Sequence, residues 1–331
     1  MLGKTAVIGA GLMGGQIALV LATGSRETFL MSRRQRTIDN ALKSIARYAG
    51  DLHRHQLLRE KTSEIIERIH TTCSLEEAAA DAELVVESVT EDLEMKRGVF
   101  RRLDHATGSH TILASNTSGL PISRLADTTE MPERVVGSHF VQPAHIVPVV
   151  EVVKGEMTSD EVIRRSTEIW HGLGRIPIVV NKDVPGFIVN RIQHAMIRES
   201  VFLLAEGVAQ AEDIDLAVSL GLAPRLTVSG PLEQRDINGI DTNYRVAKHL
   251  WRQLSGWKQP LEFLRIKVEK GELGLKTGRG YYDWTGAEAM EVRRARDDAL
   301  LQFTREVLTW RKTRGLTTSG GEMDSQSAEH Q

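Results

Sequence analysis

Short apolar runs alternate with longer segments of helical period along the first half of the chain. Residues 4–9 and 28–31 are strand-like, and residues 12–23 between them have the period of a buried helix. The short-strand pattern returns at residues 84–87 and 112–115. Because helices connect successive parallel strands, this alternation predicts a doubly wound parallel sheet.

Further segments extend the same pattern up to about residue 180. An amphipathic helix is predicted over residues 93–106, and a second helix over residues 160–172. Three more runs rich in β-branched residues lie at 135–140, 148–153 and 176–180. We expect these runs to extend the sheet with some antiparallel additions.

Two charged, helix-forming stretches follow the first βαβ unit. They cover residues 36–49 and 58–69, with Gly50 and polar residues between them. This arrangement predicts a helical hairpin inserted in the order of the sheet.

Strand-like runs disappear beyond residue 185, and the remaining periodic segments favour helices. The predicted helices are 187–207, 211–220, 241–254 and 261–270. The expected fold class is α/β, with an N-terminal Rossmann-like doubly wound sheet followed by an all-helical C-terminal domain. The expected divisions are a dinucleotide-binding domain at 1–185, a helical substrate-binding and dimerisation domain at 186–314, and a disordered tail at 315–331.

Composition narrows the range of partners. The 331 residues are 41% hydrophobic and carry a formal net charge of -2, which gives no broad field for nucleic acid or an anionic membrane. The sequence contains no run of about 18 or more consecutive apolar residues, so no membrane-spanning segment is expected. The single Cys73 excludes an internal disulfide, and the glycine-interrupted N-terminus does not favour an export signal. We therefore expect a cytoplasmic protein with neither nucleic acid nor membrane as partner.

A glycine-rich turn follows the first predicted strand and opens the first predicted helix. Gly9, Gly11 and Gly14, with Leu12 and Met13 between them, have the spacing of a dinucleotide-binding turn. Such glycines allow a tight turn and a close approach of the backbone to a pyrophosphate, which then faces the positive end of the helix. We predict that these five residues bind a nicotinamide dinucleotide.

The end of the second strand bears on which dinucleotide is preferred. An acidic residue there would accept hydrogen bonds from the ribose of NAD, but this chain has Ser32, Arg33 and Arg34. Arginine makes bidentate, charge-assisted contacts with phosphate oxygens. These three residues therefore favour NADP(H), while NAD(H) and a solvated role for both arginines stay open.

Four polar residues have the types that oxidation of an alcohol requires. They are His139, Glu151, Ser118 and Asn190. A histidine that takes a proton from a hydroxyl needs a carboxylate to fix its tautomer, and donors must hold the oxygen as it becomes a carbonyl. This chemistry requires no metal.

Six segments, taken in order over about residues 4–285, resemble the L-3-hydroxyacyl-CoA dehydrogenase family. Any one of them alone could match by chance, whereas the ordered set is specific. Beside the glycine turn, the matching segments are Val85 to Lys96, Ser115 to Ser118, Gly137 to Phe140 with Glu151 following, Asp183 to Arg191, and Lys276 to Asp283.

The resemblance implies roles for particular residues. His139 and Glu151 would form the catalytic pair, and Ser118 and Asn190 would bind the reacting oxygen. Glu91 and Lys96 would contact the nicotinamide end of the cofactor, and we assign Asn116 to cofactor binding as well. The implied activity interconverts a 3-hydroxyacyl group and its 3-oxoacyl form by hydride transfer with NAD(P), and the favoured substrate is a 3-hydroxyacyl-CoA.

Two departures from the family keep other substrates open. Where the family commonly has His-Phe-Phe-Asn-Pro, this chain has Val141 and Gln142 in the third and fourth positions. The phosphate-binding lysine of the family's helical hairpin has no clear match, although Arg54, Arg59 and Lys61 lie near its place. A free 3-hydroxy acid, such as gulonate or carnitine, and an acyl group on a carrier protein are the alternatives.

Other features fit a second class of function or a structural role. A non-catalytic dinucleotide-binding protein is the rival class, and the four retained catalytic residue types argue against it. We interpret His145, His171 and His194 as structural or surface residues, and the basic run from Arg293 to Arg296 as a solvated helix face.

Overall fold

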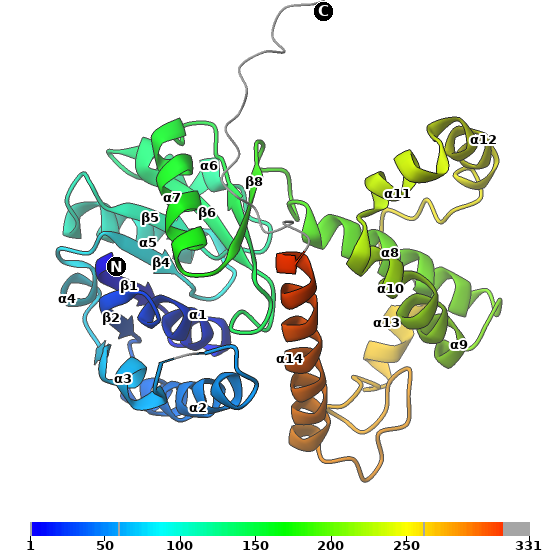
Figure 1. Cartoon of the computed structure of the whole chain (residues 1–331), viewed down its shortest axis with the longest axis horizontal. Helices are drawn as coiled ribbons and strands as arrows, with labels where there is room; N and C mark the ends of the chain where they lie inside the picture. Colours follow the sequence, from blue (N-terminus) through cyan, green and yellow to red (C-terminus); the bar gives the residue numbers. More distant parts are fainter. Residues whose placement is uncertain (1, 59, 261, 314–331) are drawn as a thin grey trace, which may run out of the picture. The chain divides into compact units, whose positions relative to one another are not determined.

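The computed structural model describes residues 2–58, 60–260 and 262–313. These residues form two compact units (Figure 1). One unit contains the described residues up to Asn190 together with those from Asp298 onward, and the other is Arg191–Asp297. The expected tail at 315–331 lies outside the described residues.

The first unit is built on one eight-stranded sheet, and it confirms the expected fold class (Figure 1). The strand order is β3-β2-β1-β4-β5-β6-β7-β8, and β6 and β7 are the only antiparallel neighbours among the described strands. Its strands are β1 Leu2–Ile8, β2 Ser25–Met31, β3 Ile69–Thr72, β4 Leu84–Glu87, β5 Ile112–Ser115, β6 Val135–Phe140, β7 Val149–Val153 and β8 Ile176–Val180. The chain direction across the sheet reverses between β1 and β4, where ligands bind in open α/β sheets.

Helices cover both faces of this sheet and bury two separate apolar clusters. One face packs against α1 Leu12–Ala22, α2 Gln35–Arg54, α3 Thr62–Glu67, α7 Asp160–Gly172 and the C-terminal part of α14 Ala289–Thr313. The other face packs against α4 Leu75–Ala79, α5 Leu93–Ala106 and α6 Ile122–Ala126. A short 3₁₀ turn, η1 Pro132–Arg134, leads into β6. Side chains alternate along each strand, so neighbouring residues of β6 and β7 reach opposite faces.

The predicted helical hairpin differs from the structure in both arms. Helix α2 continues through Gly50 to Arg54, because its buried residues at helical spacing hold it against the core on both sides of the glycine. A helical glycine costs only about 1 kcal/mol, which this packing offsets. The second arm is limited to α3, and Ile69 begins the edge strand β3 instead of ending a helix.

The second unit is helical. Its helices are α8 Val189–Ala205, which begins in the first unit, α9 Ala211–Leu216, the π-helical segment η2 Ala217–Leu222, α10 Ala223–Val228, α11 Pro231–Asn238, α12 Ile240–Leu250, α13 Glu262–Glu269 and the first part of α14. The sequence pattern missed α11 and the full extent of α14, on which the basic run Arg293 to Arg296 lies. Within the described part of the chain, no helix is both long enough and apolar enough to cross a membrane.

Candidate active site

His139 and Glu151 form a buried pair at the junction of β6 and β7. The antiparallel register of the two strands places these residues directly opposite each other. His139 Nδ1 lies 2.6 Å from Glu151 Oε2, and the two residues are 5% and 0% exposed. Because a carboxylate can only accept, Nδ1 carries the proton and donates it, which leaves the lone pair on Nε2. The pairing therefore fixes the tautomer that a proton acceptor needs.

The second oxygen of Glu151 is held by the backbone at the start of α8. Glu151 Oε1 accepts hydrogen bonds from the amides of Ile188, at 2.8 Å, and Val189, at 3.0 Å. Burial by itself would raise the pKa of Glu151, but the hydrogen bonds from His139, Val189 and Ile188 outweigh it and lower the pKa below its usual value. Glu151 is therefore ionised at neutral pH and can stabilise an imidazolium.

Phe187 packs beside the imidazole of His139. The two ring centres lie 5.6 Å apart at an angle of 57°. Phe187 is 1% exposed and has a φ of 49°, a backbone conformation that residues other than glycine rarely adopt. Such conformations concentrate at functional sites, where surrounding contacts hold them. Here the turn directs an apolar ring against the base.

Ser118 and Asn190 are brought together by a direct hydrogen bond. Asn190 Nδ2 donates to the backbone carbonyl of Ser118 at 3.0 Å. The Ser118 amide in turn donates to Glu91 Oε1 at 2.8 Å, and the Ser118 side chain belongs to an exposed residue. Ser118 Oγ and the second hydrogen of Asn190 Nδ2 are thus the groups available to an oxygen atom of a ligand.

Lys96 does not extend toward open solvent but lies in a buried ion pair. Its Nζ donates to both oxygens of Glu87, at 2.7 and 2.9 Å, and lies 3.3 Å from Glu91. Lys96 is 1% exposed and Glu87 is fully buried. Ser115 Oγ and the Val89 amide complete the set of donors around Glu87. The predicted contact of Lys96 with the cofactor stays a prediction, and the structure shows Lys96 between two carboxylates.

Glu91 connects this ion pair to the Ser118 segment. It accepts hydrogen bonds from Thr117 Oγ1 at 2.5 Å and from the Ser118 amide. Burial would raise the pKa of Glu91, but the bonds from Thr117 and Ser118 and the charge of Lys96 together lower it. Glu91 is therefore a fixed anion at neutral pH.

Asn116 links the end of β5 to the strand that carries His139. Its Oδ1 accepts a hydrogen bond from the Phe140 amide at 2.9 Å, and its Nδ2 donates to Ser88 Oγ at 3.3 Å. The predicted contact of Asn116 with a cofactor stays a prediction. The contacts present show that Asn116 holds three strand ends in register.

The glycine turn has the geometry that its spacing predicts. Gly9 has a φ of 115°, and a Cβ there would lie 2.4 Å from the Ser88 carbonyl oxygen. A Cβ on Gly14 would lie 1.7 Å from the Gly9 carbonyl oxygen, so the start of α1 packs too closely for any side chain. A Cβ on Gly11 would meet only open space, and the start of α1 has no side-chain cap and no acidic residue. This turn fits a pyrophosphate group.

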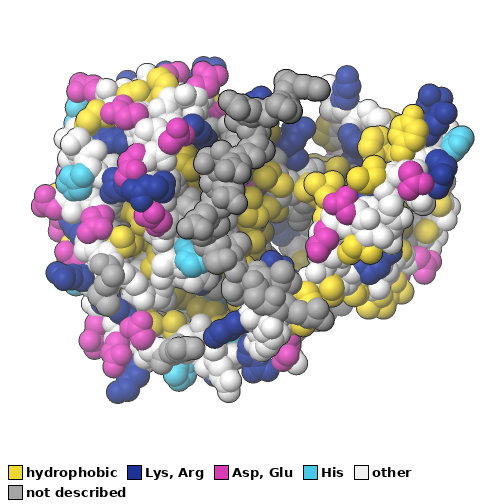
Figure 2. Space-filling view, turned by 45° about the horizontal axis from the view of Figure 1, so that its top comes forward, with side chains coloured by type: hydrophobic (Ala, Val, Ile, Leu, Met, Phe, Trp, Pro, Cys, Tyr) yellow, Lys and Arg dark blue, Asp and Glu magenta, His cyan; other side chains and the backbone are white. Residues whose placement is uncertain are grey.

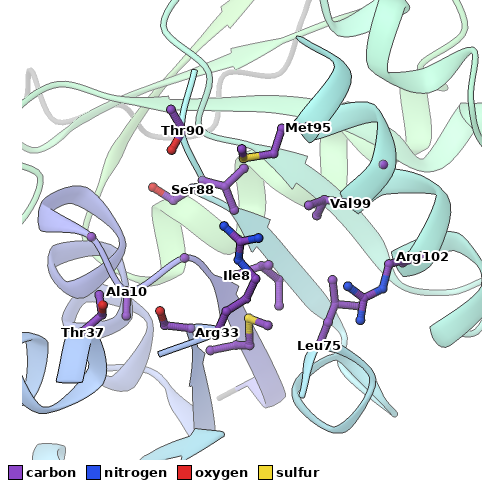
Figure 3. Close-up of a pocket in the computed structure, with 16 residues that line it drawn as sticks. Ile8, Ala10, Arg33, Thr37, Leu75, Ser88, Thr90, Met95, Val99 and Arg102 are labelled. Carbon is purple, nitrogen blue, oxygen red and sulfur yellow. The ribbon is translucent and has the colours of Figure 1, made fainter. Parts of the chain in front are cut away.

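A cavity of about 430 Å³ opens beside the turn, at the carboxyl ends of β1, β2 and β4 (Figure 3). It is lined by Ile8, Gly9, Ala10, Gly11, Met31, Ser32, Arg33, Thr37, Leu75, Ser88, Val89, Thr90, Met95, Gly98, Val99 and Arg102. None of these lining residues is acidic. The pocket has the size and the apolar walls expected for an adenosine group.

The two adjacent arginines of the sequence motif have different positions. Arg33 lines the cavity, and its guanidinium extends into the middle of the pocket in Figure 3. Arg34 is the exposed residue that precedes α2 and does not line the cavity. Arg102 lies on another wall and is bound to Glu76, with Nη2 2.7 Å from Glu76 Oε1. Arg33 is therefore the one of the pair that lines the cavity, and the predicted contact of Arg34 with a cofactor stays a prediction.

Sequence reasoning gave no role to several residues of the site. Glu87, Thr117 and Phe187 lie inside the segments that resemble the family. The pairing of Glu87 with Lys96 had one recognisable sign in the sequence, a carboxylate at the end of an apolar strand. Thr37 and Arg102 come from helices distant from the glycine turn in sequence, so no spacing could have joined them to it. Within the described residues, no group of three or more His, Cys, Asp or Glu side chains could hold a metal ion.

A doubly wound sheet with a glycine turn and a pocket beside it is typical of a dehydrogenase that uses a nicotinamide dinucleotide, and a buried His-Glu pair is typical of acid-base chemistry. Comparison with known sequences places the chain within that class. Residues 4–184 match the profile of the 3-hydroxyacyl-CoA dehydrogenase NAD-binding domain, and residues 186–284 match that of the 3-hydroxyacyl-CoA dehydrogenase C-terminal domain. The chain belongs to the 3-hydroxyacyl-CoA dehydrogenase family.

Two curated relatives and one solved structure illustrate the similarity. A probable 3-hydroxybutyryl-CoA dehydrogenase of Deinococcus radiodurans is 37% identical over 282 residues, which are 85% of this chain and 100% of that protein. The 5-formyl-3-hydroxy-2-methylpyridine 4-carboxylate 5-dehydrogenase of Mesorhizobium japonicum is 34% identical over 300 residues, 89% of this chain and 96% of that protein. A crystal structure described as an NAD+-dependent dismutase of the same pyridine carboxylate matches with a TM-score of 0.86 and 31% identity, over 93% of this chain and 99% of the other.

Proposed function

We propose that this chain interconverts a 3-hydroxyacyl-CoA and the corresponding 3-oxoacyl-CoA, with His139 as the acid and base. The observation that carries the proposal is the 2.6 Å pair of His139 and Glu151, buried and anchored by two backbone amides. A bound nicotinamide dinucleotide would supply the acceptor and donor of the hydride. The residues of the glycine turn and those that line the cavity beside it would hold this cofactor.

In the oxidative direction the protein's own groups move one proton. His139 Nε2 accepts the proton of the substrate hydroxyl, because Nδ1 is committed to Glu151. The imidazolium that results lies against the ionised Glu151, which stabilises it. In the reductive direction His139 returns the proton to the oxygen.

Ser118 and Asn190 position the oxygen during the reaction. The amide of Asn190 donates to the backbone carbonyl of Ser118, which ties the two residues together, and the Glu91 carboxylate accepts a hydrogen bond from the Ser118 backbone amide. Donors placed in this way stabilise partial negative charge, and the loss of one such donor typically costs about 3 kcal/mol. Lys96 acts through Glu91 and Glu87 and is a positioning residue in this scheme.

A free 3-hydroxy acid is the second candidate substrate, and the surroundings of Arg54 and Lys61 favour it. Arg54 is bound to Asp51, and Lys61 Nζ lies 3.8 Å from Glu64, so each of these cations already faces a carboxylate. These carboxylates weaken the attraction that a phosphate of coenzyme A would meet there. Arg59, the third cation near the expected position, lies outside the described residues.

A substrate panel tests the proposal and separates the two candidates. Reduced cofactor is followed by its absorbance with acetoacetyl-CoA, with free acetoacetate, and with the pyridine carboxylate named for the Mesorhizobium relative. We expect kcat/KM for the thioester to exceed that for the free acid by about 100-fold or more, since uniform binding energy from the carrier is lost in the acid. A faster reaction with the free acid would favour the second candidate. No turnover with any of the three would contradict the proposed activity.

For the cofactor we propose NADP(H), with NAD(H) as the alternative. The proposal rests on Arg33, which lines a cavity without acidic residues, and on the neighbouring Ser32 and Thr37. A carboxylate at this position would repel a 2′-phosphate, whereas an arginine binds it.

Replacing Arg33 with alanine tests the cofactor proposal, and Arg34→Ala is the matched control. Charge-assisted hydrogen bonds contribute roughly 1.5–3 kcal/mol, so the ratio of kcat/KM for NADPH over NADH should fall by about 10-fold or more in Arg33→Ala. Arg34→Ala should leave this ratio nearly unchanged, because Arg34 does not line the cavity. Equal use of NADPH and NADH by the unaltered protein would contradict the assignment.

We further propose that the domain at 1–185 binds the dinucleotide and that the helical domain at 186–314 binds substrate and forms a homodimer in the cytoplasm. The helical unit exposes large apolar side chains, among them Leu220 and Ile237 at 72% and Leu232 at 80% (Figure 2). A soluble monomer rarely exposes apolar area on that scale. Sedimentation equilibrium should give the mass of two chains, and the mass of one chain would contradict the dimer.

A further inference from the structure

One carboxylate connects the segment before α8 to α6 and to the loop after β7. Asp183 Oδ2 accepts hydrogen bonds from the Ser123 amide at 2.9 Å and from Ser123 Oγ at 2.8 Å, in the first turn of α6. Ser123 Oγ in turn accepts a hydrogen bond from the Glu156 amide at 2.9 Å, in the loop that follows β7. Because β7 carries Glu151, these bonds link Asp183 to the strand that holds the partner of the base.

A tight turn lies between Asp183 and the start of α8. Its central residues, Pro185 and Gly186, are those that a type II turn favours at its second and third positions. Gly186 has a φ of 81°, and the Phe187 amide donates to the carbonyl oxygen of Val184 at 3.0 Å, which closes the turn. The chain therefore runs from Asp183 through one defined turn into the amides at the start of α8.

The same segment packs against the residues that carry Ser118. A Cβ on Gly119 would lie 3.2 Å from the backbone nitrogen of Gly186, so the two backbones are in close contact. Further along, Asn190 Nδ2 donates to the carbonyl oxygen of Ser118. The two segments therefore lie side by side, with the Asp183 contact at one end and the Asn190 contact at the other.

We infer that Asp183 is a positioning residue for the proposed reaction, because it fixes the turn whose following amides bind Glu151 Oε1. The inference rests on the proposed role of His139 as acid and base. Each amide that donates to Glu151 draws charge from this carboxylate and weakens it as an acceptor. If the turn shifts and these bonds lengthen, the carboxylate attracts the Nδ1 proton of His139 more strongly. The imidazolium is then stabilised, and the imidazole takes up its second proton at a higher pH.

The surroundings of the pair make its titration a specific readout. Among the described residues, Glu151 is the only charged side chain that contacts His139. Phe187, which lies beside the ring, is neutral. Glu91 and Lys96 form the other charged pair of the site, and the hydrogen bonds of Glu91 reach the segment after β5 instead of the imidazole. A change in the protonation of His139 therefore reports on the contacts of Glu151.

The titration of His139 in the free, full-length protein tests the inference without substrate or cofactor. The chain has 11 histidines, so the protein is isotope-labelled at histidine Cε1 and the His139 signal is identified by its absence in His139→Gln. Nuclear magnetic resonance spectra are then recorded as the pH is raised. Asp183→Ala should shift the midpoint of the His139 titration upward by about 0.5 pH unit or more, the size expected when hydrogen bonds to an ionised partner weaken.

Three further variants identify the contact. In Asp183→Asn the side-chain oxygen can still accept from Ser123, so the midpoint should stay close to that of the parent. Ser123→Ala removes one of the two donors and keeps the backbone amide, so it should give a smaller upward shift and serves as the test if Asp183→Ala does not fold. Asp127→Ala is the matched control and should leave the midpoint unchanged, because this exposed aspartate at the end of α6 pairs with Arg97 and Arg124.

Kinetics provide the second measurement. With acetoacetyl-CoA, Asp183→Ala should lower kcat by about 10-fold or more while the KM for the reduced cofactor stays nearly unchanged, since the turn does not line the nucleotide cavity. A His139 midpoint that does not rise in folded Asp183→Ala and Ser123→Ala, or that rises as much in Asp127→Ala, would overturn the inference. Absence of turnover by the unaltered protein would count against the proposed function, whereas the titration alone decides whether Asp183 positions the pair.

Discussion

Replacing His139 with alanine should lower kcat by about 100-fold or more while cofactor affinity stays nearly unchanged. The substituted side chain is the only group of the described site that the structure presents as a proton acceptor with a fixed tautomer. It does not line the nucleotide cavity, which explains the expected separation of the two effects. Steady-state kinetics with acetoacetyl-CoA and a fluorescence titration of the reduced cofactor provide the two measurements.

Companion variants sharpen this result. Glu151→Gln keeps the shape of the side chain but removes the charge that stabilises the imidazolium, so it should also lower kcat strongly. The exposed His105 on α5 is the control position, and His105→Ala should leave kcat within about twofold of the parent. Normal turnover by His139→Ala would remove this histidine from the mechanism.

Replacing Lys96 with methionine should destabilise the fold by about 3–5 kcal/mol. The change leaves the Glu87 carboxylate buried without its cation, and an uncompensated buried charge carries a cost of this size. Lys96 is 1% exposed and contacts both oxygens of Glu87, so solvent cannot replace the lost partner. The midpoint of urea unfolding reports the loss.

The double variant Glu87→Gln with Lys96→Met tests the cause. Glutamine keeps hydrogen-bonding atoms near Ser115 and Val89 but carries no charge, so the double variant should be more stable than Lys96→Met alone. Lys43→Met, at an exposed position on α2, controls for the loss of a lysine and should change stability by less than about 0.5 kcal/mol. A double variant less stable than Lys96→Met would show that the charge is not the source of the loss.

Periodicity was sufficient to predict the architecture where an element is long and strongly patterned. Helices α1, α5 and α7 and all the strands except β3 have strictly periodic or continuous apolar residues, and their bounds agree with the sequence to within a few residues. The short elements β3 and α4 were missed because four or five residues do not define a period. Gly50 was given too much weight, since tertiary packing on both sides of it outweighs its helix propensity.

The sequence predicted only part of the candidate site, because some of its contacts depend on the three-dimensional arrangement of distant residues. His139 and Glu151 lie on paired strands whose register follows from the sheet, and the structure brings them together. The environment of Lys96 was not predicted, because its burial depends on Glu87 from a different element, and the one sign of the pairing in the sequence was the carboxylate at the end of an apolar strand. Likewise, only the three-dimensional arrangement shows that Arg33 lines the cavity and Arg34 does not.

One oxygen of the Glu151 carboxylate accepts a hydrogen bond from His139. The other accepts hydrogen bonds from the backbone amides at the start of α8, the helix that carries Asn190. A single anchor therefore sets both the proton acceptor and the amide that holds the reacting oxygen. If α8 tilts or slides, the strength of its hydrogen bonds to Glu151 changes, and the basicity of the imidazole changes with it. Since the same carboxylate serves the helix and the base, we expect substitutions that loosen the start of α8 to alter the pH dependence of turnover even when they touch no ligand.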